Sequence, residues 1–262
     1  MTAAELYKAG QLTAAIDAQI QEVKAKPADQ GKRLFLFELC CFAGDLDRAR
    51  RQIDVLKFEE LEVEAAARSY KGLLDAELAR RKFFADGVEP KFLMAIPEHV
   101  SWRLEAVKSL RSNLPAEAVD FLTKAEGARP ALHGTFNGKA FTSIRDCDDL
   151  FGDVLEVMAN GNYFWVPLEQ VESIALTPPR FPRDLLWRAA RLETRESAGD
   201  VFLPVLYPGS HTHQEDQIKL GRATDWSGGD SAPTRGAGTH MFLVDDDGAS
   251  LLEWQELHIE MK

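Results

Sequence analysis

The segment at residues 7–15 reads YKAGQLTAA, and the segment at residues 42–49 reads FAGDLDRA. The glycine, leucine and alanine of the first segment recur 34 residues later, as Gly44, Leu46 and Ala49. Glycine permits a tight turn between two helices, and a small alanine lets the helices approach closely where they cross. The two segments therefore predict a pair of helical hairpins near the start of the chain.

This spacing resembles the tetratricopeptide repeat, which has a period of 34 residues. Pro27 ends the first unit, and a weaker third copy follows at residues 113–118. Stacked hairpins of this kind form a concave groove that suits a peptide or a partner helix. An ordinary helical bundle is the alternative, because a glycine after a helix is common.

The rest of the first 130 residues also has a helical pattern. Apolar residues recur at intervals of three and four, and glycine or proline interrupts them between the segments. These signals predict helices over residues 3–9, 12–26, 30–43, 46–58, 62–85, 97–110 and 115–125.

The composition changes near residue 130. Residues 1–130 hold 20 lysines and arginines against 21 acidic residues, whereas residues 131–262 hold 11 against 21. Glycine, proline, asparagine and tryptophan become more frequent in the second part. We expect a helical domain at 1–130 and a mostly antiparallel β domain at 131–262, which together make an α+β protein.

Turn signals organise the second part. Asn137-Gly138 and Asn160-Gly161 are typical of hairpin turns. We expect strands at 132–136, 140–142, 154–158, 163–166, 185–194, 201–207, 241–244 and 251–259. We also expect short helices at 143–151 and 168–174, and a polar loop at 225–238.

The overall composition excludes several classes of protein. The chain has 262 residues, is 45% hydrophobic and carries a net charge of −11, which is typical of a globular protein that buries its own core. The charge disfavours nucleic acids and acidic lipids as partners, because phosphate contacts need a basic face. No run of about 18 apolar residues and no signal peptide is visible. Three cysteines without a CxxC pair are typical of a reduced, cytoplasmic protein.

His211, His213 and Asp216 form the best candidate for a metal site. Residues two apart in a strand share a face, so both imidazoles could reach one ion. With His240 brought in by the fold, the site would suit a metal-dependent hydrolase. The preceding segment 208–210, which reads PGS, favours a solvated loop instead.

A second candidate is an acidic run of five carboxylates: Asp146, Asp148, Asp149, Asp153 and Glu156. Such groups can do acid–base chemistry or bind calcium, but their spacing does not match a calcium loop. We expect them to begin a helix, where its dipole favours negative charge. No phosphate-binding loop, nucleophile elbow or zincin motif is present. The residues therefore favour an interaction protein, without a cofactor, over an enzyme.

Longer motifs in the second part are more specific. They read NGNYFWVP at 160–167, LLWRAARL at 185–192, VFLPVLYPGS at 201–210, LGRATDW at 220–226 and RGAG at 235–238. Together with the AGxL turn of the first repeat, these motifs resemble the ImpE family. This family, also called TagJ or SciE-type, accompanies type VI secretion systems in bacteria.

The resemblance implies a tetratricopeptide-like part followed by an α+β part that contains a partly open barrel. It implies a cytoplasmic accessory protein that binds the small subunit of the contractile sheath through a helix of that subunit. It also implies a link to the AAA+ ATPase that recycles contracted sheath, and no enzymatic activity. A chaperone for a secreted effector is a further alternative.

Two surfaces are candidates for partner binding. Arg222, Asp225, Trp226 and Arg235 surround the polar loop at 225–238, and clusters of arginine and aromatic side chains are enriched at binding hot spots. The groove of the helical hairpins is the second candidate.

Overall fold

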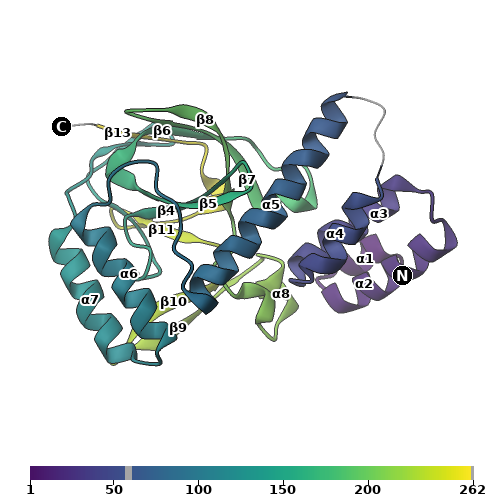
Figure 1. Ribbon diagram of the computed structural model, residues 1–262, viewed down its shortest axis with the longest axis horizontal. Coiled ribbons are helices and arrows are strands. Elements are labelled where there is room, and N and C mark those ends of the chain that lie inside the picture. Colours follow the sequence, from purple (N-terminus) through teal and green to yellow (C-terminus); the bar gives the residue numbers. More distant parts are fainter. Residues whose placement is uncertain (57–60, 261–262) are drawn as a thin grey trace.

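The computed structural model describes residues 1–56 and 61–260. Its first four helices are α1 (Ala3–Lys8), α2 (Leu12–Ala25), α3 (Gln30–Phe42) and α4 (Leu46–Asp54), which pack as two hairpins (Figure 1). Gly10 and Gly44 turn the chain with φ angles of 76° and 75°, a conformation that glycine adopts without strain. The alanines of the repeat, Ala15 and Ala49, are fully buried. The expected pair of helical hairpins is confirmed.

The next helix packs on both α4 and the sheet. Helix α5 (Leu61–Asp86) contacts strands β4 (Val154–Ala159) and β5 (Asn162–Pro167). Helices α6 (Glu98–Arg111) and α7 (Pro115–Ala128) form a third hairpin, which lies at the opposite end of the molecule from α1–α4 (Figure 1). Because contacts cross residue 130, the division into two domains at that point stays a prediction.

An eight-stranded antiparallel sheet forms the centre of the second part, in the order β2-β1-β13-β6-β7-β8-β4-β5. Its other strands are β1 (Gly134–Phe136), β2 (Lys139–Phe141), β6 (Val171–Leu176), β7 (Trp187–Thr194), β8 (Ala198–Pro204) and β13 (Glu256–Ile259). Asn137 and Asn160 turn two of the hairpins with φ angles of 48° and 49°, as expected for Asn-Gly turns. In the described part of the chain β2 and β5 do not pair, so the sheet is open and the α+β class is confirmed.

Two smaller sheets complete the second part. Strands β3 (Ile144–Asp146), β11 (Met241–Val244) and β12 (Asp247–Ser250) form one, and β9 (Thr224–Gly229) pairs with β10 (Ala232–Gly238) in the other. The short helices are η1 (Leu168–Gln170), η2 (Pro182–Leu185), η3 (Ser210–Thr212), α8 (Asp216–Lys219) and η4 (Leu251–Glu253).

Several local expectations are wrong. Residues 143–151 form strand β3 and a turn rather than a helix, because β3 pairs with β11. Residues 168–174 form one 3-10 turn and then enter β6. Residues 251–259 begin as η4 and become a strand at Glu256. Residues 225–238 form the β9–β10 hairpin rather than a loop.

The apolar core lies between α5 and the sheet. Phe83 of α5 packs edge-on against Trp165 of β5, with ring centroids 5.0 Å apart. Phe151 packs against the same indole at 5.9 Å, and all three side chains are buried. Among the described residues, no helix combines the length and apolar character that a membrane crossing requires.

Candidate functional site

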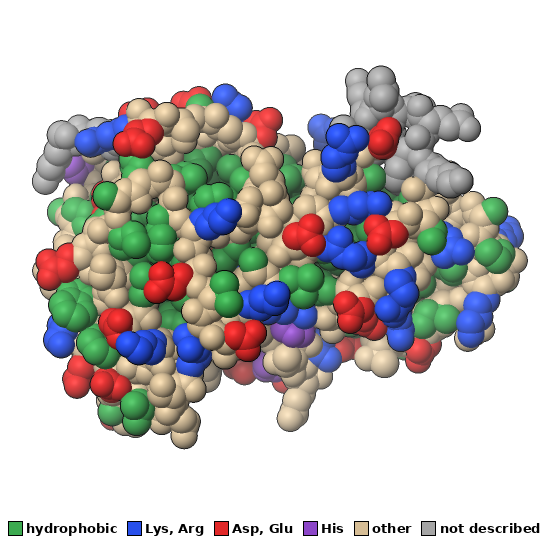
Figure 2. Space-filling model, in the orientation of Figure 1, with side chains coloured by type: hydrophobic (Ala, Val, Ile, Leu, Met, Phe, Trp, Pro, Cys, Tyr) green, Lys and Arg blue, Asp and Glu red, His purple; other side chains and the backbone are tan. Residues whose placement is uncertain are grey.

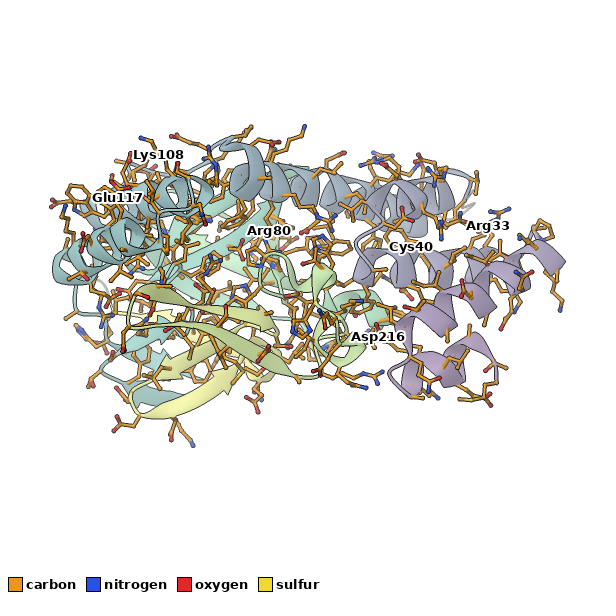
Figure 3. All side chains as sticks on the ribbon, turned by 90° about the horizontal axis from the view of Figure 1, so that it is seen from below. Arg33, Cys40, Arg80, Lys108, Glu117 and Asp216 are labelled. Carbon is orange, nitrogen blue, oxygen red and sulfur yellow. The ribbon has the colours of Figure 1, made fainter. Side chains whose placement is uncertain are left out.

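The turn between α1 and α2 is capped by a side chain from far along the sequence. Gln11 precedes α2 and makes no capping hydrogen bond with its side chain. The Asp216 carboxylate instead accepts hydrogen bonds from the backbone N–H groups of Leu12, at 2.7 Å, and Thr13, at 3.4 Å. It therefore satisfies helix donors that would otherwise lack partners. Figure 3 shows Asp216 where the second part meets the first helices.

Arg222 caps the other side of this turn. Its guanidinium donates to the carbonyl oxygens of Tyr7, at 2.6 Å, and Lys8, at 3.0 Å, and lies 5.3 Å from the Tyr7 ring centroid. A positive charge at a helix C-terminus is favourable because of the helix dipole. One short segment of the second part thus holds both ends of the first repeat turn.

The second repeat turn contacts the same part of the molecule. A Cβ atom at Gly44 would lie 2.2 Å from Cδ2 of His211, so only glycine fits beneath this imidazole. Arg81 of α5 donates to the Gly44 carbonyl oxygen at 2.8 Å. Both glycine turns therefore dock on the segment 208–222.

Buried Arg183 makes a third contact between the first four helices and the second part of the chain. Arg183 of η2 pairs with Glu38 of α3 at 2.5 Å. Its guanidinium lies between the rings of Tyr70 and Phe181, at 4.7 and 4.1 Å from their centroids. This stretch of the helical hairpins is therefore covered by the chain itself.

A groove of about 340 Å³ remains beside α5, between this helix and the turn at Pro208. Its lining side chains are Glu77, Arg80, Arg81, Phe84, Ala85, Pro208 and His211. Burial, together with the positive charges of Arg81 and Arg80, lowers the pKa of His211 to about 4. The imidazole is therefore neutral at pH 7. Figure 2 shows histidine side chains beside lysine and arginine side chains at the lower middle of this face.

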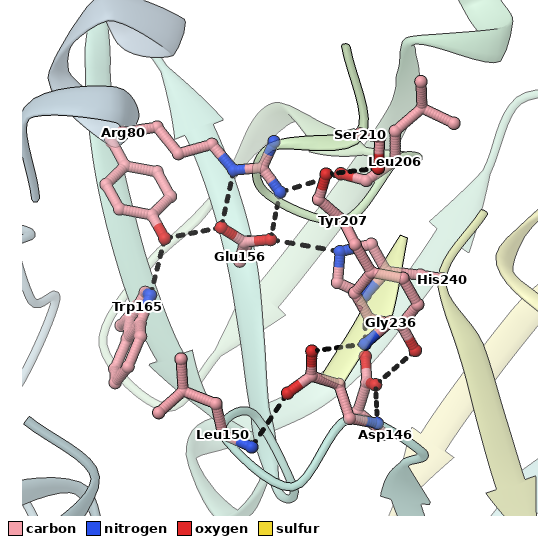
Figure 4. Close-up of polar contacts among 12 residues, drawn as sticks. Arg80, Asp146, Leu150, Glu156, Trp165, Leu206, Tyr207, Ser210, Gly236 and His240 are labelled. Atoms are coloured by element: carbon pink, nitrogen blue, oxygen red, sulfur yellow. Dashed lines mark hydrogen bonds and ion pairs between the residues drawn. The ribbon is translucent and has the colours of Figure 1, made fainter. Parts of the chain in front are cut away.

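A buried polar network lies beneath the groove (Figure 4). Arg80 of α5 donates to both carboxylate oxygens of Glu156, at 2.7 and 2.5 Å. The His240 ring bridges Glu156, at 3.1 Å, and Asp146, at 2.7 Å. Tyr207 donates to the second oxygen of Asp146 at 2.6 Å. The network therefore ties α5 to strands β3 and β4, to the connection between β10 and β11, and to the segment that follows β8.

Paired charges decide the protonation of this network. Burial alone would raise the pKa of Glu156, but the Arg80 guanidinium and His240 lower it to about 2. Burial alone would lower the pKa of His240, but Asp146 and Glu156 raise it to about 8. At pH 7 the buried ions are thus paired with opposite charges.

The space at these carboxylates is small. The cavity lined by Asp146, Glu156 and His240 measures about 10 Å³, which holds about one water molecule at most. An organic substrate does not fit there, so the arrangement is suited to holding the fold together.

The acidic run does not begin a helix. Asp146 and Glu156 belong to the buried network, and Asp148 and Asp153 pair with separate arginines. Asp148 accepts from the Arg235 side chain, with both oxygens at 2.9 Å. Asp153 accepts from Arg129 at 3.0 Å. Burial raises the pKa of Asp148 and Asp153, against the lowering effect of the arginines. The sequence rule for a helix start is wrong here because these carboxylates meet distant arginines.

The metal-site candidates lie in different surroundings. Asp216 caps α2, His211 covers Gly44, His213 lies 3.3 Å from the Asp225 carboxylate and His240 belongs to the buried network. Within residues 1–56 and 61–260, no three His, Cys, Asp or Glu side chains converge on a possible ion site.

The partner-binding candidates share the region of the β9–β10 hairpin but differ in role. Arg222 caps α1, Arg235 neutralises buried Asp148 and Asp225 contacts His213. Trp226 is 40% exposed and packs edge-on against Tyr207, with centroids 5.7 Å apart. Sequence reasoning missed Arg80 and Arg183, because nothing local distinguishes them from surface arginines.

The free energy of unfolding should fall at alkaline pH. The pKa of His240 is about 8 in the folded protein, above its ordinary value of about 6.5. The contribution of His240 to the free energy of unfolding is therefore complete below about pH 6.5 and is lost as the pH rises through 8. Between about pH 6 and pH 9.5 we expect a loss on the order of 2 kcal/mol in urea unfolding. A His240→Gln variant should lose less over this range, and parallel curves for the two proteins would contradict the assignment.

The cap supplied by Asp216 should be measurable. Asp216→Ala removes the acceptor for the N–H groups of Leu12 and Thr13, so we expect the free energy of unfolding to fall by about 1 kcal/mol. Amide hydrogen exchange at Leu12 should accelerate. The control, Asp17→Ala, removes an exposed carboxylate from α2 and should change neither quantity. Unchanged exchange in the Asp216 variant would rule out the capping role.

Comparison with known proteins identifies the family to which the chain belongs. Residues 138–258 match the family model described as ImpE protein. The chain is 32% identical to the type VI secretion system accessory component TagJ of Pseudomonas aeruginosa, over 99% of this chain and 92% of that relative. A crystal structure of a Vibrio parahaemolyticus protein matches with a TM-score of 0.90 at 25% identity, over 99% of this chain and 98% of the other. The chain belongs to the ImpE family.

Proposed function

We propose that this protein is a non-enzymatic adaptor of a bacterial type VI secretion system and works in the cytoplasm. It binds the small subunit of the contractile sheath through a helix of that subunit. It connects this subunit with the AAA+ ATPase that recycles contracted sheath. The observation that carries the proposal is the similarity to the accessory component TagJ along 99% of the chain.

The use of the charged side chains supports a role in binding. Arg80, Glu156 and His240 satisfy one another in the interior, and Asp216 caps a helix. These groups are engaged in holding two parts of the chain together. The surface features that remain for a partner are the exposed Trp226 ring and the groove beside α5.

The β9–β10 hairpin is the contact surface that we propose for the sheath helix. The Trp226 indole is held by Tyr207 on one side and remains 40% exposed. Arg235 fixes β10 through its pair with Asp148. A rigid, accessible aromatic side chain loses little entropy on binding and is a frequent anchor of hot spots.

Co-purification from a lysate of the source bacterium tests this proposal. Tagged protein should retain the small sheath subunit, identified by mass spectrometry. Trp226→Ala should lower the recovery by about tenfold or more, since a hot-spot residue contributes at least about 1.4 kcal/mol. Leu243→Ala is the control, because Leu243 is similarly exposed, at 39%, on β11.

Two results would favour the alternatives. Recovery of a secreted effector in place of sheath subunits would indicate a chaperone. Stoichiometric zinc or manganese in the purified protein, lost on His211→Ala, would indicate a metal-dependent hydrolase.

A further inference from the structure

The groove between α5 and the turn at Pro208 is lined by two kinds of side chain. Phe84, Ala85 and Pro208 are apolar, whereas Arg81 and His211 are polar and carry N–H groups. The Arg81 side chain is 27% exposed, Ala85 is exposed, and the other three are half-buried. A ligand can therefore reach both kinds of side chain. Among the described residues, those of the β9–β10 hairpin do not line the groove, so it is separate from the proposed sheath contact.

Arg81 is held in place with part of its guanidinium unused. Its Nε donates to the Glu77 carboxylate at 3.2 Å, and its Nη1 donates to the Gly44 carbonyl oxygen at 2.8 Å. The third nitrogen, Nη2, has no hydrogen-bond partner among the described residues. An arginine fixed in this way can donate to a further carboxylate with little additional loss of side-chain freedom.

His211 also has unused hydrogen-bonding groups. Its ring covers the Gly44 turn, and neither ring nitrogen has a hydrogen-bond partner in the part of the chain that the structure describes. Burial and then the positive charges of Arg81, Arg80 and Lys219 lower the pKa of this imidazole to about 4. The positive charges therefore outweigh the carboxylates at this position, and the local potential favours an anion.

We propose that this groove binds a segment of a partner protein in which an aspartate or glutamate lies between apolar side chains. The carboxylate accepts hydrogen bonds from Arg81 and His211, and the apolar neighbours lie against Phe84 and Pro208. The volume of about 340 Å³ is at the lower end of the range for binding pockets, about 300–1,000 Å³, so the groove admits a few side chains rather than a whole helix.

The two kinds of lining distinguish this occupant from simpler ones. A free carboxylate ion would leave the apolar side chains uncovered, whereas an uncharged segment would gain nothing from the positive charges. The site goes beyond the sheath contact at the β9–β10 hairpin, and it provides the second surface that an adaptor with two partners needs.

Titration of the full-length protein with three capped tripeptides tests this proposal. The probes are acetyl-Leu-Glu-Leu-amide, acetyl-Leu-Gln-Leu-amide and acetyl-Ser-Glu-Ser-amide, and binding is followed by the NMR amide signals of Ala85 and Gly209. The first probe should bind saturably. Each of the others should bind about tenfold more weakly or worse, because each loses one of the two kinds of contact.

The imidazole of His211 gives a second readout. A carboxylate bound beside it favours its charged form, so saturation with the Leu-Glu-Leu probe should raise its pKa from about 4 towards the ordinary value of about 6.5. The Leu-Gln-Leu probe should leave this pKa unchanged. NMR signals of the His211 ring between about pH 4 and pH 7 measure the change.

Matched variants locate the binding. Arg81→Gln should weaken binding of the Leu-Glu-Leu probe about tenfold. Arg50→Gln is the control, because the Arg50 side chain is 32% exposed and also pairs with a carboxylate, that of Asp75, but does not line the groove. It should leave the affinity unchanged. If the Arg81 variant does not fold, His211→Ala removes the other donor and should weaken binding to a similar extent.

Any one of four results would overturn the proposal: no saturable binding of the Leu-Glu-Leu probe, equal affinities for the three probes, an unchanged pKa of His211 at saturation, or an unchanged affinity in the groove variants. Trp226→Ala should leave tripeptide binding intact. Failure of the groove proposal is therefore distinguishable from failure of the sheath contact.

Discussion

Replacing Arg80 by methionine is expected to lower the free energy of unfolding by about 3–5 kcal/mol. Arg80 is buried, and its guanidinium donates to both oxygens of Glu156 and to the Leu206 carbonyl oxygen, at 2.8 Å. Methionine fills similar space but leaves the Glu156 carboxylate buried without its main counter-ion. Urea unfolding of the purified variant at about pH 7 measures the loss.

Two companion variants separate the buried charge from the side-chain packing. Arg50→Met breaks the partly exposed pair with Asp75 and should cost about 1 kcal/mol or less. Adding Glu156→Gln to Arg80→Met removes the unpaired charge, so the double variant should recover at least about 1 kcal/mol. Equal losses for Arg80→Met and Arg50→Met would show that the buried network contributes no more than a surface pair.

Replacing Gly44 by alanine is expected to cost about 2–4 kcal/mol. The φ angle of 75° strains any residue with a Cβ atom, and the new Cβ would also meet the His211 ring at 2.2 Å. Gly138 is a matched control, because its φ angle is 78° and nothing lies within 4 Å of a Cβ placed there. Gly138→Ala should therefore show the backbone strain alone, about 1–2 kcal/mol.

The difference between these two variants measures how firmly the second repeat turn rests on the second part. Adding His211→Ala should restore part of the Gly44→Ala loss by removing the steric conflict. The same addition to Gly138→Ala should restore nothing. If Gly44→Ala costs no more than Gly138→Ala, the turn does not press against His211 in solution.

Local sequence signals were sufficient to predict the helices and the hairpin turns. Gly10 and Gly44 identify the repeat because each turn has a positive φ angle, which glycine adopts without strain. Asn137 and Asn160 mark two β hairpins for a related reason. Each of these features depends on a few consecutive residues, so one sequence contains the information.

The buried contacts between the two parts of the chain depend instead on pairs far apart in the sequence. Arg80 and Glu156 are 76 positions apart, and Arg183 and Glu38 are 145 apart. A single sequence does not show which arginine meets which carboxylate. The acidic run therefore looked like a helix start, whereas Asp146 belongs to a buried network.

The β9–β10 hairpin was not predicted from the sequence for a different reason. Its residues are polar and rich in glycine, which usually indicates a loop. Gly236 is needed because Tyr207 lies so close that a Cβ atom would meet its ring at 2.3 Å. Gly238 adopts a φ angle of 99° next to the backbone of Ala223. Close approach, rather than flexibility, explains these glycines.

Titration calorimetry of the purified protein with the purified small sheath subunit tests the adaptor account most directly. The account predicts saturable binding with a Kd of about 1 μM or tighter, weakened about tenfold by Trp226→Ala and unaffected by Leu243→Ala. No binding of the subunit up to about 100 μM, with the protein shown to be folded, would contradict it.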